Sequence, residues 1–209
     1  MEYKIVEKFS FSDQVSGLYD KLYAITSDIE KTYPSHKNWF YVNFIGNLLK
    51  NGQALIVFAK NSETDEISGV AFINKEICKL CTLFINPKYR KMGIATKLLQ
   101  MSEISLGKKP IATVSETNYP QLKKLFEKNN YVITYKVVGY YQPGKVELCF
   151  NDFSETRILD NPSTFFDRLD KREDIDIPIY KVKDGKDYQT LFGNSYAQKI
   201  CQTGMIQEK

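Results

Sequence analysis

Residues Lys79 to Gln100, KLCTLFINPKYRKMGIATKLLQ, change character halfway along the stretch. The first half is apolar and typical of a strand; it breaks at Asn86-Pro87, becomes basic, and passes Gly93 into a pattern with helical spacing. A helix N-terminus exposes unpaired backbone N–H groups and a partial positive charge, so it binds phosphate oxygens well. A glycine there lets a ligand approach the backbone closely. The order of strand, basic turn and helix therefore predicts a phosphate-binding site.

The whole chain has the composition of an ordinary globular protein. It contains 209 residues, of which 43% are hydrophobic and 26% charged, enough for one well-buried domain with an appendage or for two small domains. No apolar run approaches the ~20 residues of a membrane span. The N-terminal sequence MEYKIVEKFSFSD alternates apolar and charged residues, where a signal peptide would be continuously apolar. We therefore expect a cytoplasmic protein that has no membrane partner.

Two of the four cysteines, Cys78 and Cys81, have the C-x-x-C spacing of some metal sites. They fall inside a predicted strand, 77–85, in which residues three apart point to opposite faces. No second pair of cysteines and no nearby histidine completes a set of four ligands. We therefore expect buried thiols and no metal.

The charge is distributed unevenly along the chain. Residues 151–209 hold nine Lys or Arg and eleven Asp or Glu, which leaves a net charge of +6 for the first 150 residues and −2 for the rest. A basic body suits a phosphate-bearing ligand or nucleic acid. The Lys-rich and Asn-rich composition of the whole chain explains the excess equally well.

Hydrophobic periodicity predicts a mixed α/β (α+β) fold, a mixed sheet with helices on it. The predicted strands are 3–8, 53–60, 67–74, 77–85, 110–115, 131–141 and 146–150. The predicted helices are 12–33 with Ser12 as N-cap, 39–50 ending at Asn51-Gly52, 92–105 and 119–128. Beyond Asn151 the weaker patterns favour a helix carrying Phe165, Phe166 and Leu169, a strand at Ile175–Val182 and a helix at Tyr188–Cys201.

The basic turn contains neither a Walker A loop nor the dinucleotide motif G-x-G-x-x-G. Its residues RKMGIA, Arg90 to Ala95, resemble the R/Q-x-x-G-x-G/A motif of the GNAT superfamily of N-acetyltransferases. The preceding LFINPKYR, Leu83 to Arg90, is similar to the family's strand pattern LYV-x-P-x-Y-R, and the predicted element order agrees with that fold. The resemblance covers roughly Tyr3 to Asn151 and implies a GNAT domain at 1–151 followed by a C-terminal extension at 152–209.

The resemblance also implies acetyl-CoA as co-substrate, with its pyrophosphate on the amides of residues 91–96 and its pantetheine arm along the preceding strand. A free backbone N–H of that strand would polarise the thioester carbonyl. Basic side chains would add counter-charge, namely Lys88, Arg90, Lys91 and Lys97. The residues expected to contact the cofactor are Leu83, Phe84, Ile85, Arg90, Lys91, Met92, Gly93, Ile94, Ala95, Thr96 and Asn118.

The chain departs from the family at the helix that follows the fifth strand. The family pattern there is N-x(6)-Y-E-K-x-G-F, and its tyrosine is the usual acid for the CoA thiolate, whereas this chain has FEKNNY from Phe126 to Tyr131. Phenylalanine cannot donate a proton, Asn130 replaces the glycine, and Asn118 stands eight residues before Phe126 where the pattern has seven. A thiolate whose pKa is near ~8.5 leaves without much help, so this loss should lower the rate rather than abolish catalysis.

Three other residues are candidates for acid–base catalysis. Glu76 begins the strand before the basic turn, where some relatives place a base, although a charged residue at a strand edge is more often only solvated. Ser115 and Glu116 end the strand that would face the cofactor cleft, but they could equally be the polar start of a loop and a helix cap. Four tyrosines are expected to be sheet residues rather than acids, namely Tyr131, Tyr135, Tyr140 and Tyr141.

The segment between the first two predicted helices holds His36, the only histidine, beside Trp39-Phe40. In GNAT enzymes this segment lines the acceptor side of the cleft, so the imidazole and the aromatic pair could receive a substrate amine. A helix-connecting loop held by Trp39 explains the same residues.

Three functions follow. The leading one is an N-acetyltransferase that moves an acetyl group from acetyl-CoA to a primary amine by direct attack. The second is a catalytically weak or idle CoA-binding module that acts through a partner, and the third is a tRNA-directed acetyltransferase toxin. The acceptor would be an amine-bearing small molecule, a protein or an aminoacyl-tRNA. The apolar residues of the extension predict that it packs on the core or on a second subunit, in a homodimer.

Overall fold

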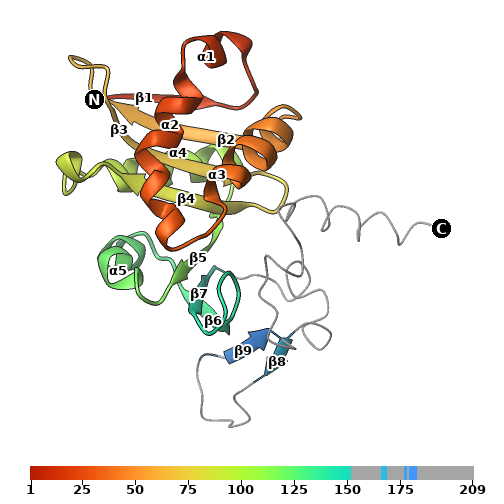
Figure 1. Ribbon diagram of the computed structural model, residues 1–209. Coiled ribbons are helices and arrows are strands. Elements are labelled where there is room, and N and C mark those ends of the chain that lie inside the picture. Colours follow the sequence, from red (N-terminus) through yellow and green to blue (C-terminus); the bar gives the residue numbers. More distant parts are fainter. Residues whose placement is uncertain (152–165, 169–176, 178, 183–209) are drawn as a thin grey trace. The chain divides into compact units, whose positions relative to one another are not determined.

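The computed structural model describes residues 1–151, 166–168, 177 and 179–182 (Figure 1). The chain divides into two compact units, Met1–Pro110 and Ile111–Lys209. Each unit contains its own set of paired strands.

The first unit is built on four antiparallel strands in sequence order: β1 (Glu2–Val6), β2 (Ala54–Lys60), β3 (Ile67–Asn74) and β4 (Lys79–Ile85). All eight residues of β3 are buried. Since successive side chains of a strand point to opposite faces, both faces of the sheet must be covered at β3.

Helices supply this cover. The helices of this unit are α1 (Phe11–Val15), α2 (Leu18–Thr26), the 3₁₀-helix η1 (Ser27–Lys31), α3 (His36–Asn38), the π-helix η2 (Trp39–Leu49), the 3₁₀-helix η3 (Pro87–Tyr89) and α4 (Ile94–Leu106). In Figure 1, α2 crosses in front of the strands and α4 lies behind them. On the η2 side, Phe72 of β3 meets the rings of Phe40 and Phe44 at centroid distances of 5.2 and 5.1 Å. These contacts form the aromatic part of the core.

The single helix predicted over 12–33 is wrong. Gly17 has a φ of +70°, a left-handed conformation that ends α1 before α2 begins at Leu18. Ser10, rather than Ser12, caps α1, because its Oγ accepts a hydrogen bond from the Asp13 amide at 3.4 Å. Periodicity alone could not separate the two helices, because their apolar positions continue one pattern across the glycine.

The second predicted helix, 39–50, is present as η2, although its backbone follows a π-helix. Its end at Asn51-Gly52 is confirmed. Gly52 has a φ of +71°, and its amide donates to the Leu49 carbonyl at 3.1 Å. The chain then enters β2, which forms the predicted hairpin with β3.

The second unit contains β5 (Ile111–Ser115), α5 (Tyr119–Lys128), β6 (Ile133–Val138), β7 (Val146–Phe150), β8 (Phe166–Arg168) and β9 (Ile179–Val182). β7 lies between β5 and β6 and is antiparallel to both, whereas β9 pairs with β6 in parallel. The predicted helix at 119–128 and the predicted strand pair 131–141 and 146–150 are confirmed. The antiparallel and parallel pairs together confirm the predicted mixed α/β fold.

Part of the chain beyond Asn151 is described. The helix predicted around Phe166 is wrong at 166–168, because these residues form β8 and pair with β9. The strand predicted at 175–182 is confirmed for 179–182, and the Tyr180 ring meets Tyr135 of β6 edge-on at 5.7 Å. The helix predicted at 188–201 lies outside the described residues. The proposed boundary at 151/152 and the role of the extension stay predictions.

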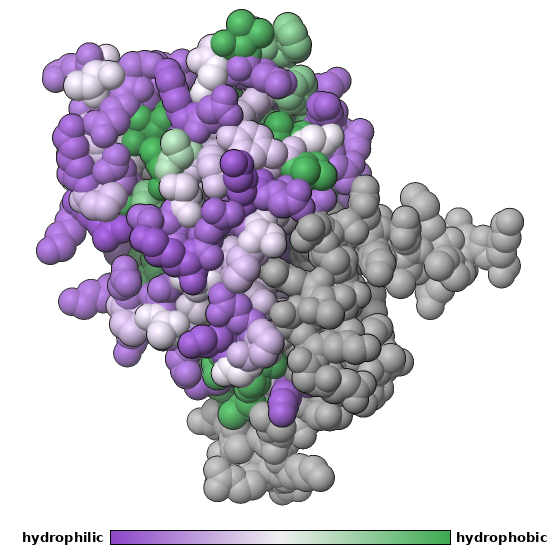
Figure 2. Space-filling view, in the orientation of Figure 1, coloured by the Kyte–Doolittle hydropathy of each residue, from purple (hydrophilic) through white to green (hydrophobic). Residues whose placement is uncertain are grey.

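The surface shown in Figure 2 is mostly hydrophilic, with an apolar spot over α1, the helix on which Phe11 and Val15 are 74% and 73% exposed. Within the described part of the chain, none of the helices combines the length and apolar character needed to cross a membrane.

Candidate active site

Residues Asn86–Gly93, here called the basic turn, connect β4 to α4. Asn86 starts it: its Oδ1 accepts from the Lys88 amide at 3.1 Å, and its carbonyl accepts from the Tyr89 amide at 2.8 Å. Pro87 suits this position, because the ring fixes φ at a helical value and the first turn needs no donor from it. The Asn86 amide donates to the Ser68 carbonyl at 3.0 Å, which ties the turn to the neighbouring strand β3.

The basic turn ends in two left-handed residues, Lys91 with a φ of +64° and Gly93 with a φ of +77°. Gly93 is the N-cap of α4, so no side chain of the cap residue bonds the first amides of the helix. The amides of Ile94, Ala95 and Thr96 have no partner within the helix, because intrahelical N–H bonds reach back four residues. A Cβ built on Gly93 would meet nothing within 4 Å. The space beside the Gly93 cap is therefore open; of the three residues that follow, Ala95 and Thr96 are half-buried and Ile94 is buried.

Cationic side chains lie close to these donors in the sequence. Arg90, Lys91 and Lys97 are exposed, and the Arg90 Nε donates to the Ile85 carbonyl at 3.3 Å. Lys88 differs, because its Nζ lies 2.9 Å from the Glu66 carboxylate, which neutralises the lysine locally. The predicted counter-charge thus reduces to three side chains beside a helix N-terminus that favours anions.

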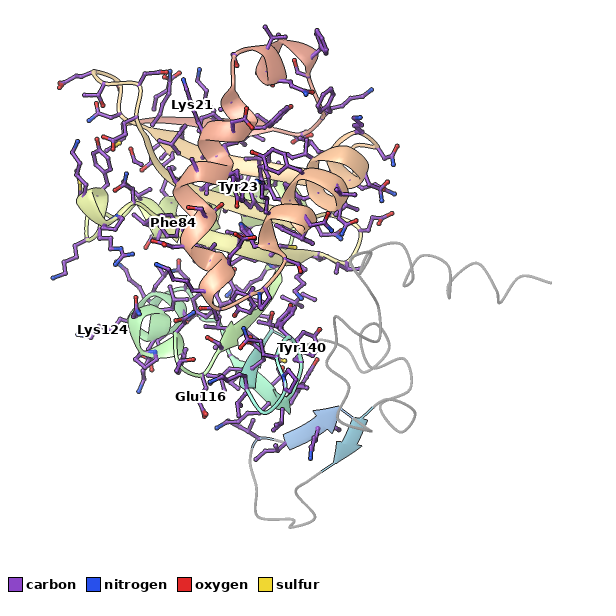
Figure 3. The ribbon with its side chains drawn as sticks, viewed as in Figure 1. Lys21, Tyr23, Phe84, Glu116, Lys124 and Tyr140 are labelled. Carbon is purple, nitrogen blue, oxygen red and sulfur yellow. The ribbon has the colours of Figure 1, made fainter. Side chains whose placement is uncertain are left out.

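The last residues of β4, Leu83, Phe84 and Ile85, are half-buried and pair with β3 (Phe84 is labelled in Figure 3). Earlier in the strand the register shifts: Phe72 pairs with Thr82 and Ile73 with Leu80, which leaves Cys81 as the extra residue of a β-bulge. Bulges bend a strand and re-aim its side chains.

The expectation that Cys78 and Cys81 share one strand is wrong. Cys78 lies in the turn before β4 with a φ of +49°, and only Cys81 belongs to the strand. Burial raises the pKa of the Cys81 thiol. Among residues 1–151 and the other described positions, no group of three His, Cys, Asp or Glu side chains could hold a metal ion.

Comparison with protein-family models points to the same family as the sequence of the basic turn. Residues 37–139 match the family model of the acetyltransferase (GNAT) domain. The chain carries a GNAT acetyltransferase domain. A search of curated proteins found no match.

Several solved structures share the fold. A protein described as a GNAT-family acetyltransferase from Desulfovibrio desulfuricans is 13% identical, with a TM-score of 0.54 over 71% of this chain and 97% of its own. An aminoglycoside 6'-N-acetyltransferase complexed with coenzyme A is 16% identical, with a TM-score of 0.51 over 72% and 95%. The ribosomal-protein-S18-alanine N-acetyltransferase from Escherichia coli is 15% identical, with a TM-score of 0.50 over 71% and 92%. At these identities the likeness shows the GNAT fold and no more.

In the GNAT domain, Phe126 lies on α5 and is 1% exposed. Its ring contacts Tyr131 at 4.7 Å and meets Phe150 edge-on at 4.8 Å. Asn118 is the N-cap of the same helix and has a helical backbone, with Pro120 in the first turn. Phe126 is therefore a core residue of the second unit.

The three proposed catalytic residues have different surroundings. Glu76 lies in the turn before β4, rather than at the start of the predicted strand, and accepts a hydrogen bond from Gln53 Nε2. Ser115 ends β5, is 3% exposed, and its Oγ accepts from Thr117 Oγ1 at 3.4 Å. Glu116 follows it and pairs with Lys136 Nζ at 3.2 Å (Glu116 is labelled in Figure 3).

His36 is buried, and its surroundings favour the structural interpretation. Thr26 Oγ1 donates to the backbone of α2, so it accepts from His36 Nε2–H at 3.1 Å, which makes Nε2 the protonated nitrogen. The imidazole stacks between Tyr23 at 6.1 Å and Trp39 at 5.6 Å. Burial lowers the pKa of His36 to about 4, although the Glu30 carboxylate acts in the opposite direction. The imidazole is therefore neutral, and its hydrogen bond to Thr26 links α3 to α2.

Two residues near the basic turn were missed by the sequence analysis. Gly69 on β3 would place a Cβ only 2.6 Å from Ile85 Cδ1 and 3.2 Å from Ile94 Cγ2, so glycine is needed for α4 to sit this close to the sheet. A glycine within a strand pattern was the available signal. Glu66, which binds side chains of the basic turn, had no signal of its own in the sequence.

Proposed function

We propose that this chain is an acetyl-CoA-dependent N-acetyltransferase that acts on a primary amine. The observation that carries the proposal is the N-terminus of α4: a left-handed glycine cap with open space at its Cβ position, three first-turn amides without a partner within the helix, and three exposed cations nearby in the sequence. A pyrophosphate needs such donors and such counter-charge. The relative complexed with coenzyme A supports the choice of cofactor, because it shares the fold.

Acetyl-CoA would supply an activated acetyl group, so the protein would mainly have to bind the cofactor and align the amine with it. The amides of Ile94, Ala95 and Thr96 would bind the pyrophosphate, with Arg90 and Lys91 adding charge. Asn118 and the strand residues Leu83, Phe84 and Ile85 would contact the rest of the cofactor. Alignment of an amine with a bound thioester accelerates transfer without a covalent enzyme intermediate.

Acid–base assistance would come from Glu76, Ser115 or Glu116. A carboxylate can take the proton of the attacking ammonium group, and a buried hydroxyl can donate a hydrogen bond to a developing charge. Single variants separate the three: removal of a true general base should lower kcat by about a hundredfold or more, whereas a solvated carboxylate should change it little. Glu76→Gln, Ser115→Ala and Glu116→Gln form the set.

A specific observation favours a second function, a CoA-binding module with little or no catalysis. Phe126 replaces the family's tyrosine acid and is buried against Tyr131 and Phe150, so this position offers no proton. The same cofactor site serves both functions.

One experiment separates them. Purified protein is mixed with acetyl-CoA and a panel of amines, including aminoacyl-tRNA, and free thiol is followed. Thiol release that depends on an amine supports the enzyme and names its acceptor class. Acetyl-CoA at about 100 times its Kd should also stabilise the fold by roughly 2.7 kcal/mol. Stabilisation without thiol release would favour the binding module, and an unchanged melting temperature at millimolar acetyl-CoA would refute both.

A further inference from the structure

One carboxylate, Glu66, receives three side chains of the basic turn. It lies where the β2–β3 hairpin enters β3, twenty residues before the turn begins. Its Oε2 accepts from Tyr89 Oη at 2.7 Å and from Lys88 Nζ at 2.9 Å, and its Oε1 accepts from Asn86 Nδ2 at 3.2 Å. These three donors occupy most of the acceptor capacity of one carboxylate.

The network continues beneath the turn. Tyr89 is 5% exposed, and Asn61 Nδ2 at the other side of the hairpin reaches its hydroxyl at 3.4 Å. Hydrogen bonds to the carboxylate, first from Tyr89 and then from Lys88, lower the pKa of Glu66 and so favour its charged form. Hydrogen bonds to an ionised acceptor are stronger than neutral ones, so the network restrains Asn86, Lys88 and Tyr89 together.

The same hairpin restrains the helix that follows the turn. Ile94, the first residue of α4, lies against Gly69, where a Cβ would come within 3.2 Å of Ile94 Cγ2. The Asn86 amide donates to the Ser68 carbonyl at 3.0 Å. The basic turn is therefore held at its start by Ser68 and Glu66 and at its end by the fit against Gly69.

We propose that Glu66 is a positioning residue for cofactor binding, one that holds the basic turn so that the amides of residues 94–96 converge on a pyrophosphate. The inference rests on the proposed function of this turn. Glu66 does not touch the ligand; it acts through Tyr89, Lys88 and Asn86. Preorganisation of the donors raises affinity because less ordering remains to be done on binding.

Removal of the Glu66 charge should change CoA affinity in opposite directions under the two explanations, positioning and simple electrostatics. A carboxylate near a polyphosphate repels it, so removing the charge of Glu66 should tighten CoA binding if only long-range charge matters. Loss of positioning should weaken it instead. Glu63→Gln is the matched control, because Glu63 is an exposed glutamate in the same hairpin and its removal changes the net charge equally.

The test measures CoA affinity by titration calorimetry for the wild type, Glu66→Gln and Glu63→Gln, well below each melting temperature. We expect Glu66→Gln to bind CoA about five- to twentyfold more weakly, as for the loss of a charge-assisted network, and Glu63→Gln to bind as well as the wild type or slightly better. In turnover the same loss should appear in KM for acetyl-CoA and leave kcat and KM for the amine nearly unchanged. Equal or tighter binding by Glu66→Gln would overturn the inference.

Two further measurements make the role specific. If Glu66 acts through Tyr89, Tyr89→Phe should weaken CoA binding as well, and the double variant should lose less than the two single losses combined. Fully additive losses would contradict that route. Hydrogen exchange of the ligand-free protein should be faster across residues 86–97 in Glu66→Gln and unchanged in Glu63→Gln. Unchanged exchange would overturn positioning even if CoA binds, whereas a wild type that binds no CoA would refute the proposed function itself.

Discussion

The basic turn and helix α5 are both sites where the GNAT family places functional residues, and they differ sharply in this chain. The turn keeps a glycine cap with a φ of +77° and open space around it, first-turn amides without a partner within the helix, and exposed cations. Helix α5 carries Phe126 where the family has a proton donor, and that ring is 1% exposed among other aromatic rings. Under the proposed function, cofactor binding and proton donation would therefore depend on separate parts of the sequence, so that one could be retained while the other changes.

The strongest test of this difference disrupts the proposed cofactor site at the basic turn. Gly93→Glu should weaken acetyl-CoA binding by about a hundredfold or more, because a side chain and a negative charge would occupy the space in front of the α4 amides. Titration calorimetry measures the loss, and circular dichroism checks the fold. Gly107→Glu is the matched control, since Gly107 caps the other end of α4 with a φ of +68° and open space around it. Equal loss in both variants would show that strain or charge, rather than the turn, is responsible.

The second prediction tests whether the stability of the first unit can change while CoA affinity at the basic turn stays the same. The pKa of His36, about 4 when folded, is below its ordinary value of 6.5. The unfolded chain therefore binds the proton more readily, and stability is lost as pH falls from about 6.5 toward 4. The contribution at pH 5 should be about 2 kcal/mol lower than at pH 7.5.

Urea unfolding at several pH values measures this slope, and His36→Gln, which cannot titrate, should flatten it in the acid range. CoA affinity at neutral pH should be the same for the variant and the wild type. A wild-type slope that survives in His36→Gln would assign the acid sensitivity to other groups.

The third prediction concerns the α5 side of the comparison. Phe126→Tyr should lower the free energy of unfolding by about 1–3 kcal/mol, because the added hydroxyl would be buried among the rings of Tyr131 and Phe150. Acetyl-CoA affinity should not change, and turnover per folded molecule should not fall, because the substitution removes none of the proposed cofactor contacts or proton donors. Phe126→Leu is the control for lost ring packing. A large drop in kcat with intact binding would show that the packing of Phe126 itself supports the chemistry.

The smallest expected effect is at Lys136, whose Nζ pairs with Glu116 at 3.2 Å. Both side chains are partly exposed, at 31% and 55%, so Lys136→Gln should cost less than about 1 kcal/mol of stability. Thermal unfolding at low and high salt measures this difference, which should shrink as salt screens the pair. A larger, salt-independent loss would mean that Lys136 has a packing role beyond the ion pair.

Much of the fold could be predicted, because the sequence encodes it locally. The helix at 119–128, the β2–β3 hairpin and the end of η2 at Asn51-Gly52 follow from apolar periodicity and turn residues. The split of helix 12–33 at Gly17 and the strand at 166–168 were not predicted, since one glycine in a continuing pattern and a short strand both need neighbours to decide them. The register shift at Cys81 likewise depends on the partner strand.

By itself, the sequence determined the order of the strands over residues 1–150, and it determined the basic turn and glycine-capped helix that we propose bind a phosphate. A proline, basic residues and a glycine before a helical pattern act through backbone conformation over a few residues, so their meaning is local. Only the tertiary structure decided that Glu66 binds Asn86, Lys88 and Tyr89, that Gly69 admits Ile94, and that His36 is a neutral structural group. Those properties depend on side chains that are distant in the sequence, or on loss of water around a titratable group, and folding alone brings both about.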